Sequence, residues 1–124
     1  MKQDINSSED VKKLVDTFYE KVNADEVLSP VFNDFAKVDW PKHLPRMYQF
    51  WESILFSTGE YQGRPFQKHI PLPINETHFE RWVSLFIKNT DEHFVGERAE
   101  EAKHRARTIA HIFNTKLAHI NYHE

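Results

Sequence analysis

The sequence predicts an all-α domain, and two features support that prediction. The chain has 124 residues, with glycine only at positions 59, 63 and 96, and all six prolines lie between Pro30 and Pro73. Both ends are therefore free of residues that break helices. Apolar side chains recur every three or four residues in four segments, as on one face of a helix, whereas no segment alternates with a period of two. These patterns favour four helices and no sheet.

The first helix is predicted from about Asp10 to Leu28, with Ser7 or Ser8 as its N-cap and Pro30 limiting its end. Residues 30–40 are expected to form a loop or short turn that carries three aromatic residues. The apolar positions of this helix are Val11, Leu14, Val15, Phe18, Tyr19 and Val22.

The second helix is predicted to begin near Asp39 and to end at Thr58-Gly59. Pro41 suits its first turn, whereas Pro45 predicts an irregularity there. A single helical turn is expected around Phe66–His69, before Pro71 stops it. The apolar face of the second helix comprises Leu44, Met47, Phe50, Trp51, Ile54 and Leu55.

The third helix is predicted over about Asn75–Val95, with Asn75 or Thr77 as the cap, and Gly96 breaks the chain. The fourth is predicted over about Glu97–Asn121. One face of the third helix carries Phe79, Trp82, Val83 and Phe86. One stripe of the fourth carries Ala99, Ala102, Ala106, Ile109, Ala110, Phe113, Leu117 and Ile120.

Composition excludes several classes of function. A net charge of -3 argues against a broad basic face for nucleic acid or an anionic membrane. The absence of cysteine excludes disulfides, thiol nucleophiles, iron–sulfur clusters and covalently attached haem. The start of the chain is polar and no apolar run approaches the roughly 20 residues of a membrane helix, so we expect a cytoplasmic protein. Aromatic residues reach 14%, which predicts a very aromatic core or a flat apolar ligand.

Among the eight histidines, His69 has an unusual setting. Pro71 and Pro73 fix the backbone beside it, and a rigid apolar flank suits an axial metal ligand whose ring must be held in one orientation. A buried structural histidine is the alternative. The remaining histidines other than His43 are expected at the surface, namely His78, His93, His104, His111, His119 and His123.

Three further side chains are candidates for a binding site. Tyr19 and Trp82 both lie on apolar helix faces and carry hydrogen-bond donors. Such donors need a partner, which is either a backbone carbonyl or a bound diatomic ligand. His43 begins the second helix, where it stands at the polar entrance of an apolar face or lies at the surface.

Several segments, in order and over nearly the whole chain, give this sequence its resemblance to a known family. They are Asp-Thr-Phe-Tyr-Glu-Lys-Val at 16–22, Pro-Val-Phe at 30–32, Trp-Pro-Lys-His at 40–43, Phe-Trp at 50–51, Tyr-Gln-Gly-Arg-Pro at 61–65, Lys-His-Ile-Pro-Leu-Pro at 68–73 and His-Phe-Glu-Arg-Trp at 78–82. With an alanine-rich last helix, the sequence resembles the truncated globins, most closely group III. The resemblance implies a single globin domain over residues 1–124, with residues 1–8 as a flexible N-terminal tail.

The resemblance also implies a two-over-two helical sandwich around non-covalent haem b, with a short proximal helix. His69 would then be the proximal ligand of the haem iron, and Tyr19 and Trp82 would donate hydrogen bonds to the distal ligand. His43 would stand at the distal gate. The remaining cofactor-binding residues would be Phe32 on the macrocycle, Met47 in the pocket, Leu72 and Phe79, with Arg46 and Lys68 near the propionates; Trp51 would close the distal core.

Such a protein binds oxygen, nitric oxide and carbon monoxide reversibly. The resemblance leaves oxygen transport or storage, sensing, nitric oxide detoxification and peroxidase-like chemistry open, and turnover would need an electron-donating reductase. We expect a monomer. Two alternatives are a cofactor-free helical module and a di-metal helical bundle. The bundle needs two Glu-x-x-His motifs, whereas only Glu101 and His104 have that spacing.

Overall fold

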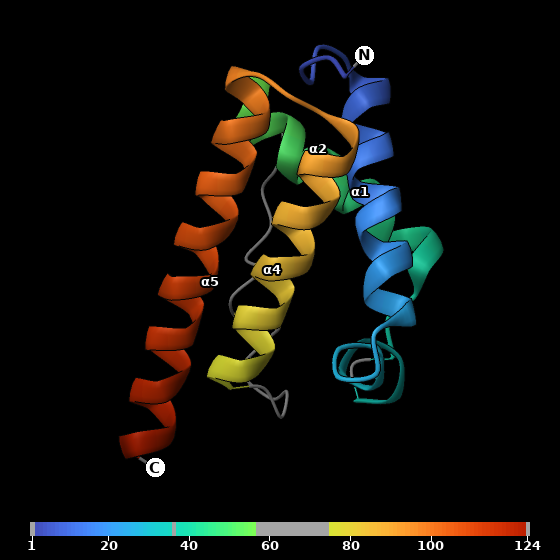
Figure 1. Cartoon of the computed structure of the whole chain (residues 1–124). Coiled ribbons are helices and arrows are strands. Elements are labelled where there is room, and N and C mark those ends of the chain that lie inside the picture. The colour runs from blue at the N-terminus through green and yellow to red at the C-terminus, as the bar shows by residue number, and fades with distance from the viewer. Residues whose placement is uncertain (1, 36, 57–74, 124) are drawn as a thin grey trace.

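The fold consists of two helix pairs laid one over the other, in a computed structural model that describes residues 2–35, 37–56 and 75–123. Helices α1 (Ser8–Ala24) and α2 (Trp40–Phe56) form one pair, and α4 (Glu76–His93) and α5 (Glu97–His123) form the other. Between the pairs, α1 lies on α4 and α2 lies on α5. The antiparallel neighbours α4 and α5 are joined by a short connection (Figure 1). The all-α class and the two-over-two sandwich are confirmed.

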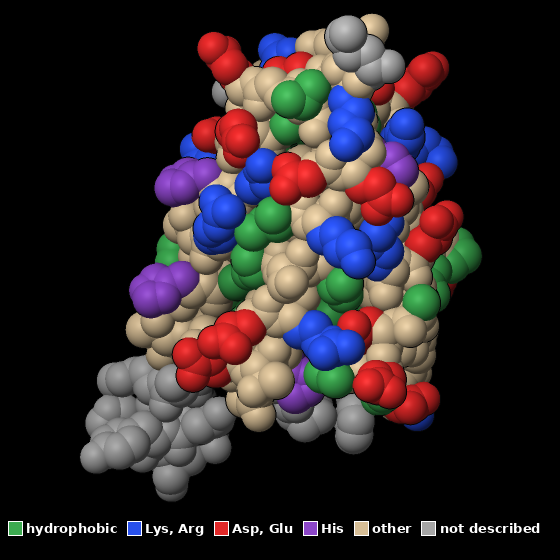
Figure 2. All heavy atoms as spheres, in the orientation of Figure 1, with side chains coloured by type: hydrophobic (Ala, Val, Ile, Leu, Met, Phe, Trp, Pro, Cys, Tyr) green, Lys and Arg blue, Asp and Glu red, His purple; other side chains and the backbone are tan. Residues whose placement is uncertain are grey.

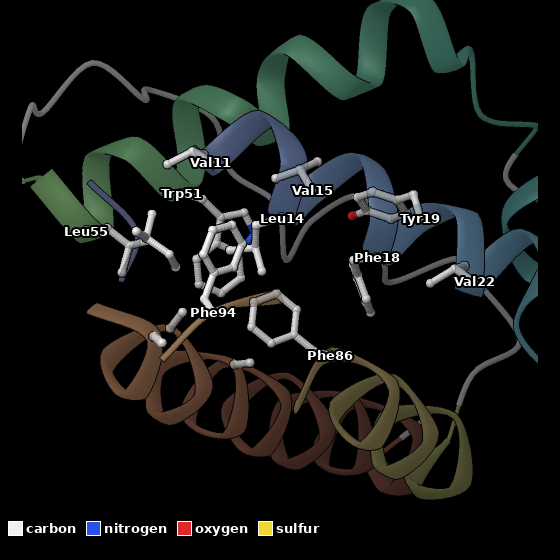
Figure 3. Packing of buried hydrophobic residues seen from close by; sticks show 14 of the residues in the cluster. Val11, Leu14, Val15, Phe18, Tyr19, Val22, Trp51, Leu55, Phe86 and Phe94 are labelled. Carbon is white, nitrogen blue, oxygen red and sulfur yellow. The ribbon is translucent and has the colours of Figure 1, made fainter. Parts of the chain in front are cut away.

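Helix α1 has one fully buried face. All six apolar positions predicted on its face are buried, and Ser7 is its N-cap, accepting a hydrogen bond from the Asp10 N–H at 3.3 Å. Its side chains point toward α2 and toward α4 (Figure 3). Phe18 contacts the rings of Trp82 and Phe86 on α4, with centroid distances of 5.5 and 5.1 Å.

The end of α1 comes four residues earlier than the sequence predicted, at Ala24 instead of Leu28. The reason is Asp25, whose carboxylate accepts hydrogen bonds from the backbone N–H groups of Val27 and Leu28 at 2.9 and 3.0 Å. These local bonds compete with continuation of the helix. The chain then enters a π-helix, Val31–Phe35, where a loop or short turn was expected.

Asp25 also joins this turn to α4, because Arg81 Nε lies 2.8 and 2.6 Å from its two carboxylate oxygens. Burial opposes ionisation of this carboxyl group, but the hydrogen bonds from Arg81 and the two backbone N–H groups outweigh burial and lower its pKa. The connection after α1 is thereby fixed to the helix that carries Trp82.

Helix α2 is continuous from Trp40 to Phe56 with Pro45 inside it, so the irregularity expected at Pro45 does not interrupt the helix. Trp51 and Leu55 are buried, and the rest of its predicted apolar face is half-buried.

Helix α4 begins with a capping box in which Asn75 and His78 bond each other's backbone N–H. His78 therefore caps a helix. The buried stripe predicted on α5 is confirmed for Ala99, Ala102, Ala106 and Ala110.

A buried amide joins α1 to α4 through polar contacts. Asn89 is fully buried, and its Nδ2 donates to the Leu14 carbonyl at 3.1 Å while its Oδ1 accepts from Lys21 Nζ at 2.9 Å. Because a buried amide is costly unless it is hydrogen-bonded, this arrangement favours one register of α1 against α4.

The N-terminal residues are held against α5, where the sequence had predicted a flexible tail. Ile5 is 0% exposed. The Asp4 carboxylate accepts hydrogen bonds from the backbone N–H groups of Arg98 and Ala99 at 3.0 and 2.9 Å, and so caps α5 from a distant part of the sequence. Gly96 permits this approach, because its φ is +137° and a Cβ there would lie 2.5 Å from Asp4 Cγ.

Some predicted features lie outside the described residues. They are the end of the second helix at Thr58-Gly59, the helical turn around Phe66–His69, and the side chains of Leu117, His119, Ile120 and His123. Within residues 2–35, 37–56 and 75–123, no helix combines the length and the apolar character needed to cross a bilayer.

Asp4→Ala should lower the free energy of unfolding by about 1–2 kcal/mol at neutral pH, as expected for a lost helix cap. Burial opposes ionisation of Asp4, but backbone N–H groups of Arg98, Ile5 and Ala99 outweigh it and lower its pKa below 3.8. A lowered pKa stabilises the fold above about pH 4, and this stabilisation is lost as pH falls through the pKa of the folded state.

Urea denaturation at several pH values tests this prediction. The difference between wild type and Asp4→Ala should shrink as pH falls below 4. Glu80→Ala, which removes an exposed carboxylate on α4, is the control and should change stability little. A difference that stays constant down to pH 2 would show that the Asp4 charge contributes nothing.

Candidate functional site

Four aromatic rings from three elements form a cluster at one end of the α1–α2 interface. Tyr19 lies 5.2 Å from Trp40, 5.4 Å from His43 and 5.9 Å from Phe32, measured between ring centroids. Trp40 stacks on Phe32 at 6.0 Å and contacts His43 at 5.5 Å. The structure therefore brings together three predicted site residues, Tyr19, His43 and Phe32.

The sequence of α1 explains how Tyr19 reaches this cluster. Phe18 and Tyr19 are consecutive, so their side chains leave the helix about 100° apart. Phe18 packs toward α4, whereas Tyr19 packs against residues of α2 (Figure 3). Tyr19 is only 7% exposed, and the Nε2 atom of His43 is buried. A phenol and an imidazole thus lie side by side in an apolar environment.

Trp82, on α4, is connected to Tyr19 through the ring of Phe18. Its indole is half-buried, packing edge-on against Phe18 at 5.5 Å and stacking on Phe86 at 5.7 Å. Tyr19 also contacts Phe18, at 5.0 Å. The ring of Phe18 therefore contacts both predicted hydrogen-bond donors.

The face of α2 beyond His43 is apolar and only partly covered. Met47, one turn after His43, is half-buried, as is Phe50. Trp51 is buried in the core, 3% exposed. Arg46 is exposed on the adjoining face. This order of residues leads from a polar edge at His43 to apolar side chains deeper along the helix.

A hydrogen bond beside the cluster fixes α2 against α1. The Tyr48 hydroxyl donates to an Asp16 carboxylate oxygen, and the other oxygen lies 2.7 Å from Lys12 Nζ. Burial raises the pKa of Tyr48, and the neighbouring Asp16 carboxylate raises it further. The phenol is consequently held neutral, as a donor, between the two helices that carry Tyr19 and His43.

The other predicted residues are more scattered. Phe79 is half-buried and lines a surface groove between α4 and α5. Among the histidines expected at the surface, His104 and His111 are exposed, whereas His93 is half-buried and burial lowers its pKa. On the face over α4 and α5, basic and acidic side chains are interspersed (Figure 2).

His69, Lys68 and Leu72 lie outside the described residues. In the part of the chain that is described, no group of three or more histidine, aspartate or glutamate side chains is arranged to hold a metal ion.

Sequence reasoning missed Trp40 as a member of the site. The sequence places it in the Trp-Pro-Lys-His segment at 40–43 and among the aromatic residues before the second helix, but assigns it no role in the site. The available signal was its spacing: Trp40 stands three residues before His43, so both residues share one face once the helix begins at Trp40.

Comparison with known proteins identifies the family of this chain. The model of the bacterial-like globin family matches residues 3–118. This chain belongs to that family. The globin is 33% identical over 121 residues to the group 3 truncated hemoglobin ctb of Campylobacter jejuni, a match that covers 94% of this chain and 95% of that protein. The resemblance to group III truncated globins is confirmed.

Solved structures agree with this assignment. The globin matches the crystal structure of a group III truncated hemoglobin from Campylobacter jejuni with a TM-score of 0.84 and 34% identity, covering 94% of this chain and 95% of that one. It matches a truncated oxygen-avid haemoglobin from Bacillus subtilis with a TM-score of 0.71 and 25% identity, covering 86% and 92% respectively.

Membership of this family makes the chain a haem-binding globin for small diatomic ligands such as oxygen. The described residues fit such a group. Haem is flat and mainly apolar, and the rings of the cluster and the partly covered face of α2 offer apolar surface of that kind. Tyr19, His43 and Trp82 add a small number of polar atoms to it, as a ligand pocket requires.

Proposed function

We propose that this globin holds haem b non-covalently, with His69 as the axial ligand, and binds oxygen beside Tyr19. Haem iron supplies the reversible binding of diatomic ligands. The chain supplies the pocket: Tyr19 and Trp82 donate hydrogen bonds to the ligand, and His43 is the gate. The remaining proposed cofactor contacts are Phe32, Met47, Leu72 and Phe79, with Arg46 and Lys68 pairing the propionates.

The observation that carries this proposal is the burial of the Tyr19 phenol beside the His43 imidazole, 5.4 Å away, within an otherwise aromatic cluster. A buried hydroxyl in such surroundings is a strong donor, because the local dielectric constant is low. It therefore supports a site that binds a small ligand able to accept a hydrogen bond.

Two donors beside one ligand favour chemistry on bound oxygen over its simple delivery. Hydrogen bonds that stabilise partial negative charge on the ligand slow its release. Slow release suits oxygen-dependent chemistry, such as nitric oxide detoxification or peroxidase-like reactions, in which the ligand stays bound until a second reactant arrives. Repeated turnover would draw electrons from a reductase partner.

His69→Ala should remove specific haem binding at physiological pH, because the iron loses the imidazole that is proposed to bind it. Wild-type protein should take up haemin and show a strong Soret band, whereas the variant should do so only when imidazole is added. His104→Ala and His111→Ala replace exposed histidines on α5 and should leave the absorbance spectrum unchanged. A normal ferrous deoxy spectrum in His69→Ala would eliminate His69 as the ligand.

Tyr19→Phe and Trp82→Phe should each speed oxygen release by roughly 10-fold to 100-fold. Each change deletes a hydrogen bond to a partly charged acceptor, worth about 1.5–3 kcal/mol, with little change in volume. The double variant should be non-additive, because both donors serve one small ligand. Stopped-flow measurement of oxygen dissociation tests this, and unchanged rates in both single variants would place neither donor beside the ligand.

His43→Ala should speed ligand association more than it speeds oxygen dissociation. Tyr19 and Trp82 already supply two donors, so the imidazole at the edge of the apolar α2 face is proposed to control access. Carbon monoxide association after laser photolysis, compared with oxygen dissociation, separates these effects. If dissociation accelerates as much as in Tyr19→Phe while association is unaltered, His43 stabilises the ligand directly and is not a gate.

A further inference from the structure

The imidazole of His43 is enclosed by two aromatic rings that also touch each other. Its ring lies edge-on to Tyr19, at 5.4 Å and 78°, and edge-on to Trp40, at 5.5 Å and 83°. Tyr19 and Trp40 complete the triangle at 5.2 Å. Edge-to-face geometry is favourable for aromatic pairs. The imidazole therefore gives up contacts with two rings whenever it swings outward.

Trp40 is itself held at both its face and its N–H. The ring stacks on Phe32 with an interplanar angle of 25°, and Nε1–H donates to Asn33 Oδ1 at 3.0 Å. Asn33 Nδ2 donates in turn to Asn23 Oδ1 at 2.9 Å and to the Ser29 carbonyl at 3.1 Å. This hydrogen-bonded series connects the indole, through the π-helix, to α1.

We propose that Trp40 is a positioning residue for His43, and that Asn33 fixes Trp40 in the orientation that keeps the imidazole against Tyr19. Trp40 thereby sets how often the gate opens. The inference rests on the proposed function, because it concerns the gate assigned there to His43. It adds two residues to that function, neither of which is assigned a contact with the ligand.

Two variants remove the anchoring hydrogen bond and keep an aromatic ring at position 40. Trp40→Phe deletes the indole N–H, and Asn33→Ala deletes its acceptor. Both should speed carbon monoxide association about 3-fold to 10-fold, the scale of one weakened aromatic contact, and should change oxygen dissociation less than twofold. Asp34→Ala, which changes the neighbouring exposed side chain of the same π-helix and leaves the Asn33–Trp40 hydrogen bond in place, is the matched control and is expected to remain near the wild-type rate. Asn33 is exposed, so its variants should fold normally.

A double-mutant cycle decides whether Trp40 acts through His43. Trp40→Phe and Asn33→Ala should have no effect on association when combined with His43→Ala. NMR of the carbon monoxide complex supplies a second measurement, since the proximity signals between the ring protons of His43 and Tyr19 should weaken in Trp40→Phe and Asn33→Ala and persist in Asp34→Ala.

The outcomes separate this inference from the proposed function. If His43→Ala speeds association but Trp40→Phe and Asn33→Ala do not, the gate stands and the positioning role is overturned. If these two variants speed association equally with and without His43, Trp40 blocks access directly and the positioning role is again overturned. If His43→Ala leaves association unchanged, the gate itself fails.

Discussion

Three aromatic rings, from Trp51 on α2 and from Phe86 and Trp82 on α4, stack in nearly parallel planes at the centre of this globin. Trp51 lies 4.7 Å from Phe86, and Phe86 lies 5.7 Å from Trp82. Phe18 of α1 meets the edges of Phe86 and Trp82. Helices α1, α2 and α4 therefore contribute to one group of rings, and the position of each of these helices is constrained by the others.

This group of rings also orients Tyr19. Phe18 has its position fixed by two rings of α4, and the next residue, Tyr19, must then leave the helix in the direction of α2. On that side it meets His43 and Trp40. The geometry of the aromatic cluster around Tyr19 is thus a consequence of apolar packing, because rotation of α1 about its axis would displace Phe18 from the core and Tyr19 from the cluster together. Asn89 and the Tyr48–Asp16 hydrogen bond oppose the same rotation from two sides.

The helices and their buried faces could be predicted from the sequence because they follow from local spacing. The face of α1 and the alanine stripe of α5 are visible as period-3.6 patterns, and Ser7 and Asn75 are local caps. The end of α1 was predicted too late because the decisive bonds involve the Asp25 side chain and, across 56 positions, Arg81. The role of Asp4 depends on a separation of 94 residues.

Some residues of the candidate site could likewise be predicted from the sequence, and others could not. Tyr19, His43 and Trp82 could be selected from residue type and resemblance, since each is a polar group on an apolar face. Trp40 was missed because its contacts with Phe32 and Asn33 depend on the π-helix before α2, which has no strong sequence signal. The positions of Phe32 and Asn33 follow from the same short helix.

The contact between residues 3–5 and the start of α5 has a consequence for synthesis of the protein. Asp4 and Ile5 are synthesised before their partners, because Arg98 and Ala99 follow more than 90 positions later. At typical rates of translation this delay is roughly 5–20 s. During that interval Ile5 lacks some of the apolar contacts that bury it in the folded chain. Docking of residues 3–5 therefore waits until the start of α5 has been synthesised.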